Sequence, residues 1–476
     1  MTPTAQYDLV ILGGGAAAFA AITEADRRDL STAIVNTGLP LGGTCVNVGC
    51  VPSKHLLEVG KTAFEPPQNP FDAVTYDEDQ PKTDWAAAID EKDAIVASLR
   101  EQNYVDVAKH FETDVYEGYG QFVDATTIDV VDGADVGTTV TGEKVLIATG
   151  SSPWIAPIDG IGNVDYETSE SILERRELPE SLVVIGGGYV AMEWGQILHH
   201  MGVDVTILQR SEHVLSGMWP ELGRDLQSHF RADGITVVTD TSPTSVSQSG
   251  GDVHVSTAVD DEQREFTASE LFVATGVEPN TTGIGLDAID VETDDQGAVV
   301  VDASFQTGNQ DVYAAGDCIG EPMLETVAAK EGNHAVKNAF GGEHNEIDYN
   351  AVPKVVYTSP EVASVGITEP EYMDEHGTCT CRTVEMADVP KAKAVEDTRG
   401  FVQVVKHHET DEIVGVHMVG SRAADMIPEA TLAVKFGLTV DDIIDTIHPF
   451  PTFSEAFKHA CQAFRRDISK MSCCVE

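Results

Sequence analysis

The stretch from Tyr7 to Ala18 reads YDLVILGGGAAA and decides the fold of the first part of the chain. Its first six residues are typical of a buried parallel strand, and the glycines that follow open an alanine-rich helix. In this G-x-G-x-x-A pattern Gly13 permits the tight turn, Gly15 lets the backbone approach a pyrophosphate, and Ala18 allows close packing of helix and strand. The stretch therefore predicts a dinucleotide site with its phosphates at the helix N-terminus.

The next predicted strand, residues 32–35, ends without the acidic residue that usually follows it. Asn36 stands where a carboxylate normally binds the adenosine ribose hydroxyls. Because an amide can still hydrogen-bond a hydroxyl, we expect a weaker contact at this point rather than the loss of the site.

A second glycine unit begins about 170 residues later. Residues 181–185 (SLVVI) predict another buried strand, and Gly186, Gly188 and Ala191 repeat the spacing of the first loop. Since each unit of this kind binds one dinucleotide, the chain is predicted to bind two.

The strand predicted at residues 203–208 bears on the choice of the second nucleotide. It ends in Gln209 and Arg210, where an NAD-specific site usually carries a carboxylate. An arginine there can pair with a 2′-phosphate, which favours NADPH and leaves NADH possible. The alternative is that Arg210 is an ordinary surface residue.

Charge and hydropathy exclude several classes of partner. The 476 residues include 79 acidic and 29 basic ones, a net charge of −50. So acidic a chain argues against nucleic acid and anionic membranes as partners, and the even spread of acidic residues predicts a halophilic protein whose self-repulsion is screened by salt. No run approaches the about 18 apolar residues of a transmembrane helix, and no signal-like segment opens the chain, so we expect a cytoplasmic location.

The most specific segment is residues 42–54, GGTCVNVGCVPSK. Cys45 and Cys50 stand five residues apart on a predicted distorted helical turn, where they can close a strained disulfide. Eight cysteines in so long a chain do not make a secreted disulfide scaffold. In a reducing cytosol a closely spaced pair indicates catalysis or metal binding.

This segment resembles the redox-active disulfide of the pyridine nucleotide-disulfide oxidoreductases, and the resemblance covers nearly the whole chain. It implies an α/β fold with two Rossmann-like domains, for FAD and NADPH, and an α+β C-terminal dimerisation domain. It also implies that Cys45 is the substrate-facing thiol, that Cys50 touches the flavin, and that Lys54 pairs with Glu193 beside the flavin. The further cofactor-binding residues predicted are Gly43, Thr44, Thr149, Gly150, Tyr189, Gly276 and Asp317.

The predicted domains follow from these motifs. Ala-Thr-Gly triplets close two strands, at residues 148–150 and 274–276, and mark where the chain passes between the nucleotide domains. We predict an FAD domain at residues 1–152 and 278–346, an NADPH domain at 153–277, and an interface domain at 347–476. The resemblance implies a homodimer in which the partner's C-terminal segment completes each active site.

The C-terminal segment separates the members of this family. Dithiol-disulfide members carry His-Pro-Thr-x-Ser-Glu, whose histidine moves protons for the substrate thiol. In this chain that position is Phe450, which cannot move a proton, while Glu455, which would orient the imidazole, remains. His448, two residues earlier, is the possible replacement.

Mercuric reductases, a branch of the family, also lack that histidine and end in a vicinal cysteine pair, as Cys473 and Cys474 do here. The resemblance implies that this tail pair takes Hg(II) from small-thiol complexes. It then passes the ion to Cys45 and Cys50 of the other subunit, because thiolates are the soft ligands that soft metals prefer. Tyr104 aligns with a tyrosine near the bound metal, and its alternative role is packing on a helix face.

The preferred function is NADPH-dependent reduction of Hg(II) to elemental mercury, and two alternatives stay open. One is a thiol-disulfide reductase that uses His448 or the tail cysteines as a relay. The other is a flavoprotein that sequesters metal through the tail without turnover. Cys318 and Cys461 are predicted as buried packing residues. The pairs at residues 199–200 and 407–408 are expected to be solvated histidines.

Overall fold

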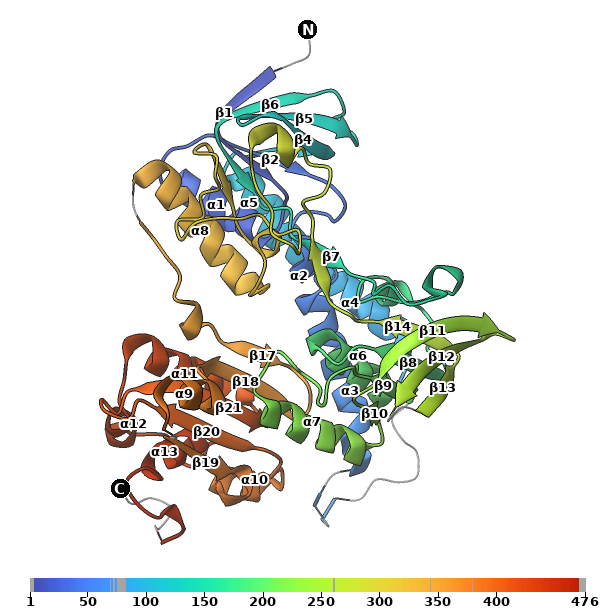
Figure 1. The fold of residues 1–476 in the computed structure, drawn as a ribbon, viewed down its shortest axis with the longest axis vertical. Helices are drawn as coiled ribbons and strands as arrows, with labels where there is room; N and C mark the ends of the chain where they lie inside the picture. The colour runs from blue at the N-terminus through green and yellow to red at the C-terminus, as the bar shows by residue number, and fades with distance from the viewer. Residues whose placement is uncertain are drawn as a thin grey trace.

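The computed structural model describes residues 4–68, 70–71, 73–74, 83–259, 262–342, 344–378 and 380–470. Its elements form three parts, which Figure 1 shows as an upper body, a lower right body and a lower left body. The tail cysteines Cys473 and Cys474 lie outside the described residues.

The upper body is built on a mainly parallel sheet around β1, whose residues Leu9, Val10, Ile11 and Leu12 are buried. Late in the chain β16 returns and pairs in parallel with β6, so that residues about 165 positions apart share the sheet. In sheet order the strands are β3 (Asp114–Glu117), β2 (Thr32–Asn36), β1 (Thr4–Leu12), β6 (Thr139–Ile147), β5 (Thr127–Asp132) and β4 (Tyr119–Asp124), with β16 (Val312–Ala314) on β6.

Two helices that are far apart in the sequence, α1 and α8, pack against each other in this body. Gly332 of α8 approaches Ala17 of α1 so closely that a Cβ at Gly332 would lie 2.1 Å from the Ala17 carbonyl oxygen. The helices of this part of the chain are α1 (Ala16–Asp26), α2 (Gly43–Asn47), α3 (Cys50–Phe64), α4 (Trp85–Arg100), the π-helical turn η2 (Glu101–Val105), α5 (Asp106–His110) and α8 (Glu325–Gly341).

The lower right body contains the second glycine unit in a parallel four-stranded sheet. The chain enters and leaves it through the short antiparallel pair β7 (Ser151–Pro153) and β15 (Val277–Pro279). Its elements are β8 (Ser181–Ile185), α6 (Tyr189–His200), β9 (Asp204–Leu208), α7 (Pro220–Asp233), β10 (Thr236–Val238) and β14 (Glu270–Val273), with an antiparallel sheet of β11 (Ser242–Ser249), β12 (Asp252–Val259) and β13 (Glu262–Ala268).

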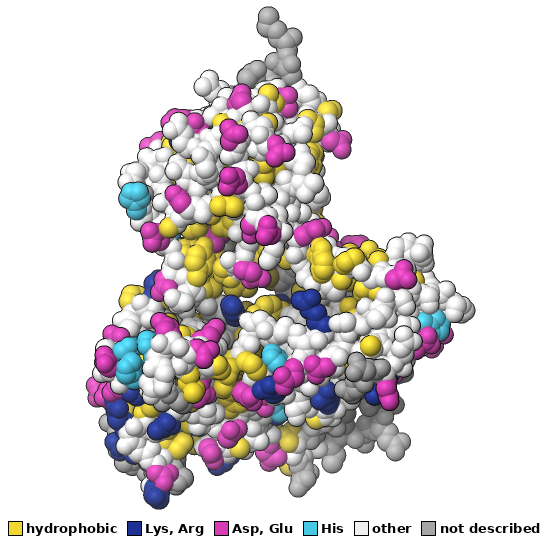
Figure 2. Space-filling view, in the orientation of Figure 1, with side chains coloured by type: hydrophobic (Ala, Val, Ile, Leu, Met, Phe, Trp, Pro, Cys, Tyr) yellow, Lys and Arg dark blue, Asp and Glu magenta, His cyan; other side chains and the backbone are white. Residues whose placement is uncertain are grey.

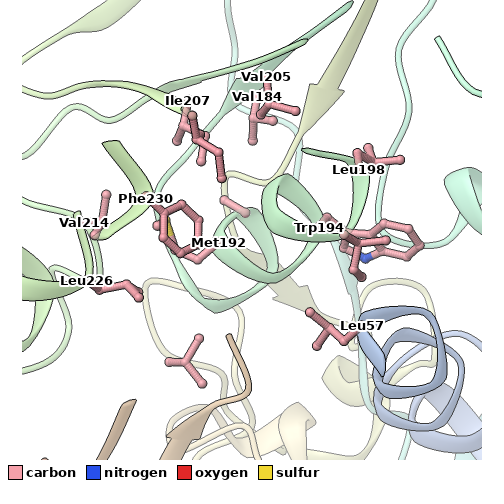
Figure 3. Packing of buried hydrophobic residues seen from close by; sticks show 14 of the residues in the cluster. Leu57, Val184, Met192, Trp194, Leu198, Val205, Ile207, Val214, Leu226 and Phe230 are labelled. Atoms are coloured by element: carbon pink, nitrogen blue, oxygen red, sulfur yellow. The ribbon is translucent and has the colours of Figure 1, made fainter. Parts of the chain in front are cut away.

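One buried cluster fixes α6 between its own sheet and α3. Figure 3 shows Met192 on the same side of α6 as Phe230 of α7, while Trp194 lies toward Leu57 of α3. Deleting such a buried side chain costs about 2–5 kcal/mol, so this packing holds α3 and α6 in one register. The register matters because α3 carries Cys50 and Lys54, and α6 carries Glu193.

The lower left body is a five-stranded antiparallel sheet with helices packed on it. Cys461, on the last described α-helix, is fully buried in this core, as predicted. The elements are β17 (Lys354–Val356), β18 (Glu361–Gly366), α9 (Glu369–His376), β19 (Cys381–Glu385), α10 (Pro390–Val395), β20 (Phe401–Lys406), β21 (Ile413–Gly420), α11 (Ala423–Phe436), α12 (Val440–Asp445) and α13 (Glu455–Gln462).

The predicted fold class, two Rossmann-like domains and an α+β C-terminal domain, is confirmed. The boundaries at residues 152, 277 and 346 stay predictions. Cys318 is fully buried, as predicted. The prediction of solvated histidines at residues 199–200 was wrong for His200, because its ring stacks on Phe64 with centroids 4.1 Å apart and burial lowers its pKa to about 3.

The surface bears on partners. Figure 2 shows Asp and Glu side chains scattered over all three bodies rather than gathered in one patch. Halophilic behaviour stays a prediction. None of the helices among the described residues has the length and apolar character needed to cross a bilayer.

Candidate functional site

A cavity of about 960 Å³ opens at the carboxyl ends of β1, β2 and β6. This is the position at which open α/β sheets bind their ligands. Most of the residues predicted for the first dinucleotide site line it together with the cysteine pair: Gly13, Gly15, Asn36, Gly43, Thr44, Cys45, Cys50, Thr149, Gly150 and Asp317. Ala18 lies behind them, fully buried in the contact between α1 and the sheet.

The two glycine loops adopt the same turn. Gly13 has φ +114°, and a Cβ there would lie 2.1 Å from the carbonyl oxygen of Ala148. Gly186 has φ +119°, and its Cβ would lie 2.2 Å from the carbonyl oxygen of Ala274. Only glycine fits either position, so each loop brings its helix N-terminus close to the end of the sheet.

Both helix N-termini are open toward a ligand. Gly15 and Gly188 are the N-cap residues of α1 and α6, and neither supplies a side-chain cap. Backbone N–H groups at such ends bind phosphates. Thr149 Oγ1, in the wall of the cavity, is buried and has no hydrogen-bond partner among the described residues. A bound dinucleotide would supply partners for the backbone N–H groups at the start of α1 and for the Thr149 hydroxyl. The cavity therefore fits a dinucleotide.

Two further lining residues have defined partners. Asp317 accepts a hydrogen bond from Ser151 Oγ over 2.6 Å, and burial raises the pKa of its carboxyl. Asn36 donates through Nδ2 to the carbonyl of Leu39 over 2.9 Å, which leaves its amide oxygen for a ribose hydroxyl. The ribose contact proposed from the sequence is therefore geometrically open.

Cys45 and Cys50 face each other across the junction of α2 and α3. They are not joined by a disulfide, and their Sγ atoms lie within 4.8 Å of each other. Cys50 is exposed to the cavity, yet the protein around it raises the pKa of its thiol by burial, while the charge of Lys54 acts in the opposite direction. The pair is thus arranged as a dithiol that can hold an ion or close a disulfide.

Lys54, one turn along α3 from Cys50, forms the predicted ion pair. Its Nζ lies 2.6 Å from Glu193 Oε2, and Glu193 is buried. The backbone N–H of Tyr357 donates to Glu193 Oε1 over 3.0 Å, and Lys54 Nζ lies 4.8 Å from the centre of the Tyr357 ring. No sequence motif indicated this role of Tyr357, because its contact depends on how the lower left body packs against α3 and α6.

Sequence reasoning also missed Glu325, the first residue of α8. A carboxylate oxygen of Glu325 and the Sγ atoms of Cys45 and Cys50 all lie within 4.8 Å of one another. Burial raises the pKa of the Glu325 carboxyl to about 7. No motif indicated this residue, because a glutamate opening a helix is a common partner of the helix dipole.

Tyr104, a residue of the π-helical turn η2, lies beside Glu325. Its hydroxyl donates to Glu325 Oε1 over 3.4 Å, and its ring packs edge-on against Phe19 with centroids 4.9 Å apart. The structure therefore supports a packing contact and a polar contact at once, and places Tyr104 next to the cysteine pair through Glu325.

The second glycine unit leaves two side chains open to solvent. Tyr189 begins α6 and is 36% exposed, and Arg210 is exposed directly after β9. Gln209 is buried and donates through Nε2 to the carbonyl of His213 over 3.2 Å. Arg210 is therefore the side chain at the strand end that a nucleotide phosphate could reach. Gly276 follows β14 at the same edge and accepts from Trp154 N over 2.9 Å.

The predicted C-terminal residues that the structure describes lie in the lower left body. Phe450 is 48% exposed, and Glu455 is buried at the start of α13 with Oε2 accepting from the backbone N–H of Thr452 over 3.3 Å. Neither Phe450 nor Glu455 is among the described residues that line the cavity of Cys45 and Cys50. Within one chain the structure therefore does not bring this segment to the cysteine pair.

Both ring nitrogens of His448 are already engaged. Nδ1 lies 2.9 Å from the carbonyl oxygen of Thr446, and Nε2 lies 2.8 Å from Glu429 Oε1 of α11. Its side chain is only 6% exposed. A histidine held on both nitrogens within its own subunit has no free nitrogen for a substrate thiol, which weighs against its use as an acid/base.

Comparisons with known proteins agree with this geometry. Residues 7–332 match the family described as pyridine nucleotide-disulphide oxidoreductase, and residues 352–461 match its dimerisation domain. Proteins named mercuric reductase from Lysinibacillus sphaericus and Streptomyces lividans are each 38% identical, over 98% of this chain and 84% and 98% of their own lengths. A Cu(II) complex of the HOCl-induced flavoprotein disulfide reductase RclA from Escherichia coli, 24% identical, shares the fold with a TM-score of 0.86 over 96% of this chain and 99% of that one. The chain therefore belongs to the pyridine nucleotide-disulphide oxidoreductase family.

Proposed function

We propose that this protein is a FAD-dependent enzyme that uses NADPH to reduce Hg(II) to elemental mercury. The observation that carries the proposal is a dithiol pair, Cys45 and Cys50, at the wall of a dinucleotide-sized cavity, with no free imidazole in the segment where disulfide reductases hold theirs. A bound soft ion needs thiolate ligands and two electrons, but no base to activate a thiol substrate. Relatives named mercuric reductase support the same choice.

The first cavity would hold FAD. The backbone at Gly13 and Gly15 would bind its pyrophosphate at the start of α1, Asn36 its ribose, and Asp317 its ribityl chain. When bound, a flavin supplies the transfer of an electron pair from a nicotinamide to the side of the cavity where the cysteines lie. The ion pair of Lys54 with Glu193 places one fixed positive charge next to that side.

The second glycine unit would bind NADPH. Gly186, Gly188 and Ala191 shape the cradle at the start of α6, and the exposed guanidinium of Arg210 would pair with the 2′-phosphate. Tyr189, at the first position of α6, would cover the nicotinamide pocket. The overall reaction is balanced when NADPH and Hg(II) give NADP⁺, one proton and elemental mercury.

The remaining residues act across a homodimer. Cys473 and Cys474 of one subunit would take Hg(II) from small-thiol complexes and exchange it onto Cys45 and Cys50 of the partner subunit. Large apolar side chains are exposed on the region that matches a dimerisation domain, and burial against a partner subunit would remove their apolar surface from water. They include Leu432, Phe436, Ile447 and Phe450.

The test is anaerobic NADPH oxidation by the purified dimer in molar potassium chloride with excess small thiol, with and without Hg(II), while volatile mercury is trapped. Metal-dependent oxidation matched by released elemental mercury is expected. The double variant Cys473→Ala/Cys474→Ala should abolish this turnover, and Cys381→Ala, remote from the cavity on β19, serves as its control. Turnover on a disulfide that Hg(II) does not alter would instead identify a thiol-disulfide reductase. Stoichiometric metal uptake without NADPH oxidation would identify a sequestering protein.

A further inference from the structure

We propose that Glu325 is the third ligand of a mixed thiolate-carboxylate metal site with Cys45 and Cys50, and that this site binds borderline divalent cations such as Zn(II) as well as Hg(II). The inference rests on the proposed function only in taking the two cysteines as metal ligands. It adds a donor that lies 275 residues from Cys50 in the chain.

The spacing of the three donor atoms suits a small cation. All three lie within 4.8 Å of one another. Around a zinc ion with bonds of about 2.3 Å to sulfur and 2.0–2.2 Å to oxygen, tetrahedral ligand atoms are about 3.6–3.8 Å apart. The atoms therefore need to move by only about 1 Å, which small side-chain rotations supply.

The Glu325 carboxylate is held on one oxygen and lacks a partner on the other. Oε1 accepts from the Tyr104 hydroxyl over 3.4 Å, whereas Oε2 is buried and has no hydrogen-bond partner in the described part of the chain. Tyr104 is itself fixed by its edge-on contact with Phe19. An oriented ligand whose outer partner is fixed in this way is the usual arrangement around protein-bound metals.

The charge balance also favours a cation at this position. Two thiols and a carboxyl group converge here, and Lys54, which lies one turn along α3 from Cys50, is already paired with Glu193 at 2.6 Å. When a divalent ion binds, these groups release their protons, and the negative charges that result balance the charge of the ion.

The donor set distinguishes between ions. Hg(II) is soft, and two thiolates satisfy it, so a carboxylate adds little to its binding. Zn(II) accepts sulfur and oxygen together and commonly keeps three protein ligands with one open position. Because Zn(II) has no redox chemistry, it would occupy the pair without being reduced and so inhibit turnover of Hg(II) reversibly.

The test measures Zn(II) affinity on the FAD-loaded dimer, reduced anaerobically with a phosphine, by competition with a chromophoric chelator. All proteins carry Cys473→Ala/Cys474→Ala, so that the tail pair does not compete with Cys45 and Cys50 for the ion. Glu325→Gln should weaken Zn(II) binding by at least about tenfold. Glu321→Gln is the matched control, because it removes the same charge from an exposed position four residues earlier and near the site.

Equal Zn(II) affinities for the parent and Glu325→Gln, or an equal loss in Glu321→Gln, would overturn the inference. The flavin absorbance spectrum of each variant establishes that it is folded and loaded. The outcome is separate from that of the proposed function: loss of Zn(II) affinity in Glu325→Gln supports the third ligand even if the protein with an intact tail releases no mercury.

Discussion

Lys54 Nζ lies 2.6 Å from Glu193 Oε2, and this ion pair joins α3, which begins with Cys50, to α6 of the second glycine unit. Glu193 is nearly buried, with 8% of its side chain exposed, while Lys54 is 33% exposed. The ion pair therefore fixes α3, which carries Cys50, relative to α6, the helix that would bind the nicotinamide nucleotide. Removing the lysine leaves a buried carboxylate without its cation.

Lys54→Met should lower the free energy of unfolding by about 1–3 kcal/mol, a buried-pair cost reduced for the partial exposure of the lysine. Denaturant unfolding of the FAD-loaded protein measures it. Lys109→Met removes an exposed lysine that also pairs with acidic residues, and it should leave stability unchanged. Equal effects of the two variants would contradict a structural role for the Lys54 pair.

Arg210→Gln should raise the KM for NADPH by about 10–100-fold, the loss expected for one charge-assisted contact to a phosphate. Since NADH lacks the 2′-phosphate, its KM should stay the same in the variant. Steady-state kinetics with both nucleotides under the same salt concentration provide the comparison. If both KM values rise together, Arg210 supports the fold of the loop rather than the phosphate.

His448→Gln should keep metal-dependent NADPH oxidation within about twofold, because the ring is already hydrogen-bonded to Thr446 and Glu429 inside its own subunit. Glu429→Gln, which removes the partner of Nε2, should behave in the same way. A large loss of kcat in His448→Gln with retained flavin absorbance would show that His448 moves a proton in the reaction.

Phe436→Glu/Ile447→Glu should convert the dimer to a monomer. The two side chains are 67% and 91% exposed, on the region that matches a dimerisation domain, and burying two carboxylates in an apolar interface is costly. Analytical ultracentrifugation measures the change, and NADPH oxidation should be lost with it because in the proposed function each site receives the ion from the partner's tail. Val136→Glu is the control that should remain dimeric, because Val136 is an apolar residue of the upper body whose side chain is 60% exposed.

His417 should make the protein less stable as the pH falls. It is fully buried between Ser364 Oγ at 2.8 Å and the carbonyl oxygen of Ile367 at 3.0 Å, and burial lowers its pKa from 6.5 to about 4. Between these values the unfolded chain binds a proton that the folded chain does not. The contribution of His417 to the free energy of unfolding is therefore complete above the unfolded pKa. It decreases as the pH falls toward the folded pKa.

Unfolding free energies measured between pH 7 and pH 5 at constant salt test this expectation. His417→Gln should reduce the dependence of stability on pH by about one proton per molecule. His200, whose pKa burial lowers to about 3, contributes in the same direction and remains in the variant. An unchanged dependence on pH would mean that His417 is not kept neutral by its surroundings.

The glycine loops and the cysteine segment could be predicted from sequence because their determinants are local. At Gly13 and Gly186 a positive φ and a carbonyl about 2 Å from any Cβ admit glycine alone, so a pattern of six residues after a strand specifies the turn. The strand predicted at residues 181–185 is β8 with those bounds. The Cys45 and Cys50 pair needs only the turn between α2 and α3.

The tertiary structure alone decided which distant groups meet these local units. Glu325 reaches the cysteine pair because α8 packs on α1. Glu429 hydrogen-bonds to the His448 ring because α11 lies beside the segment before α13. His200 is buried because α3 covers α6. A sequence pattern specifies which face of a helix is apolar, but the contacts between helices depend on the packing of whole side-chain surfaces, which residues far apart in the chain build together.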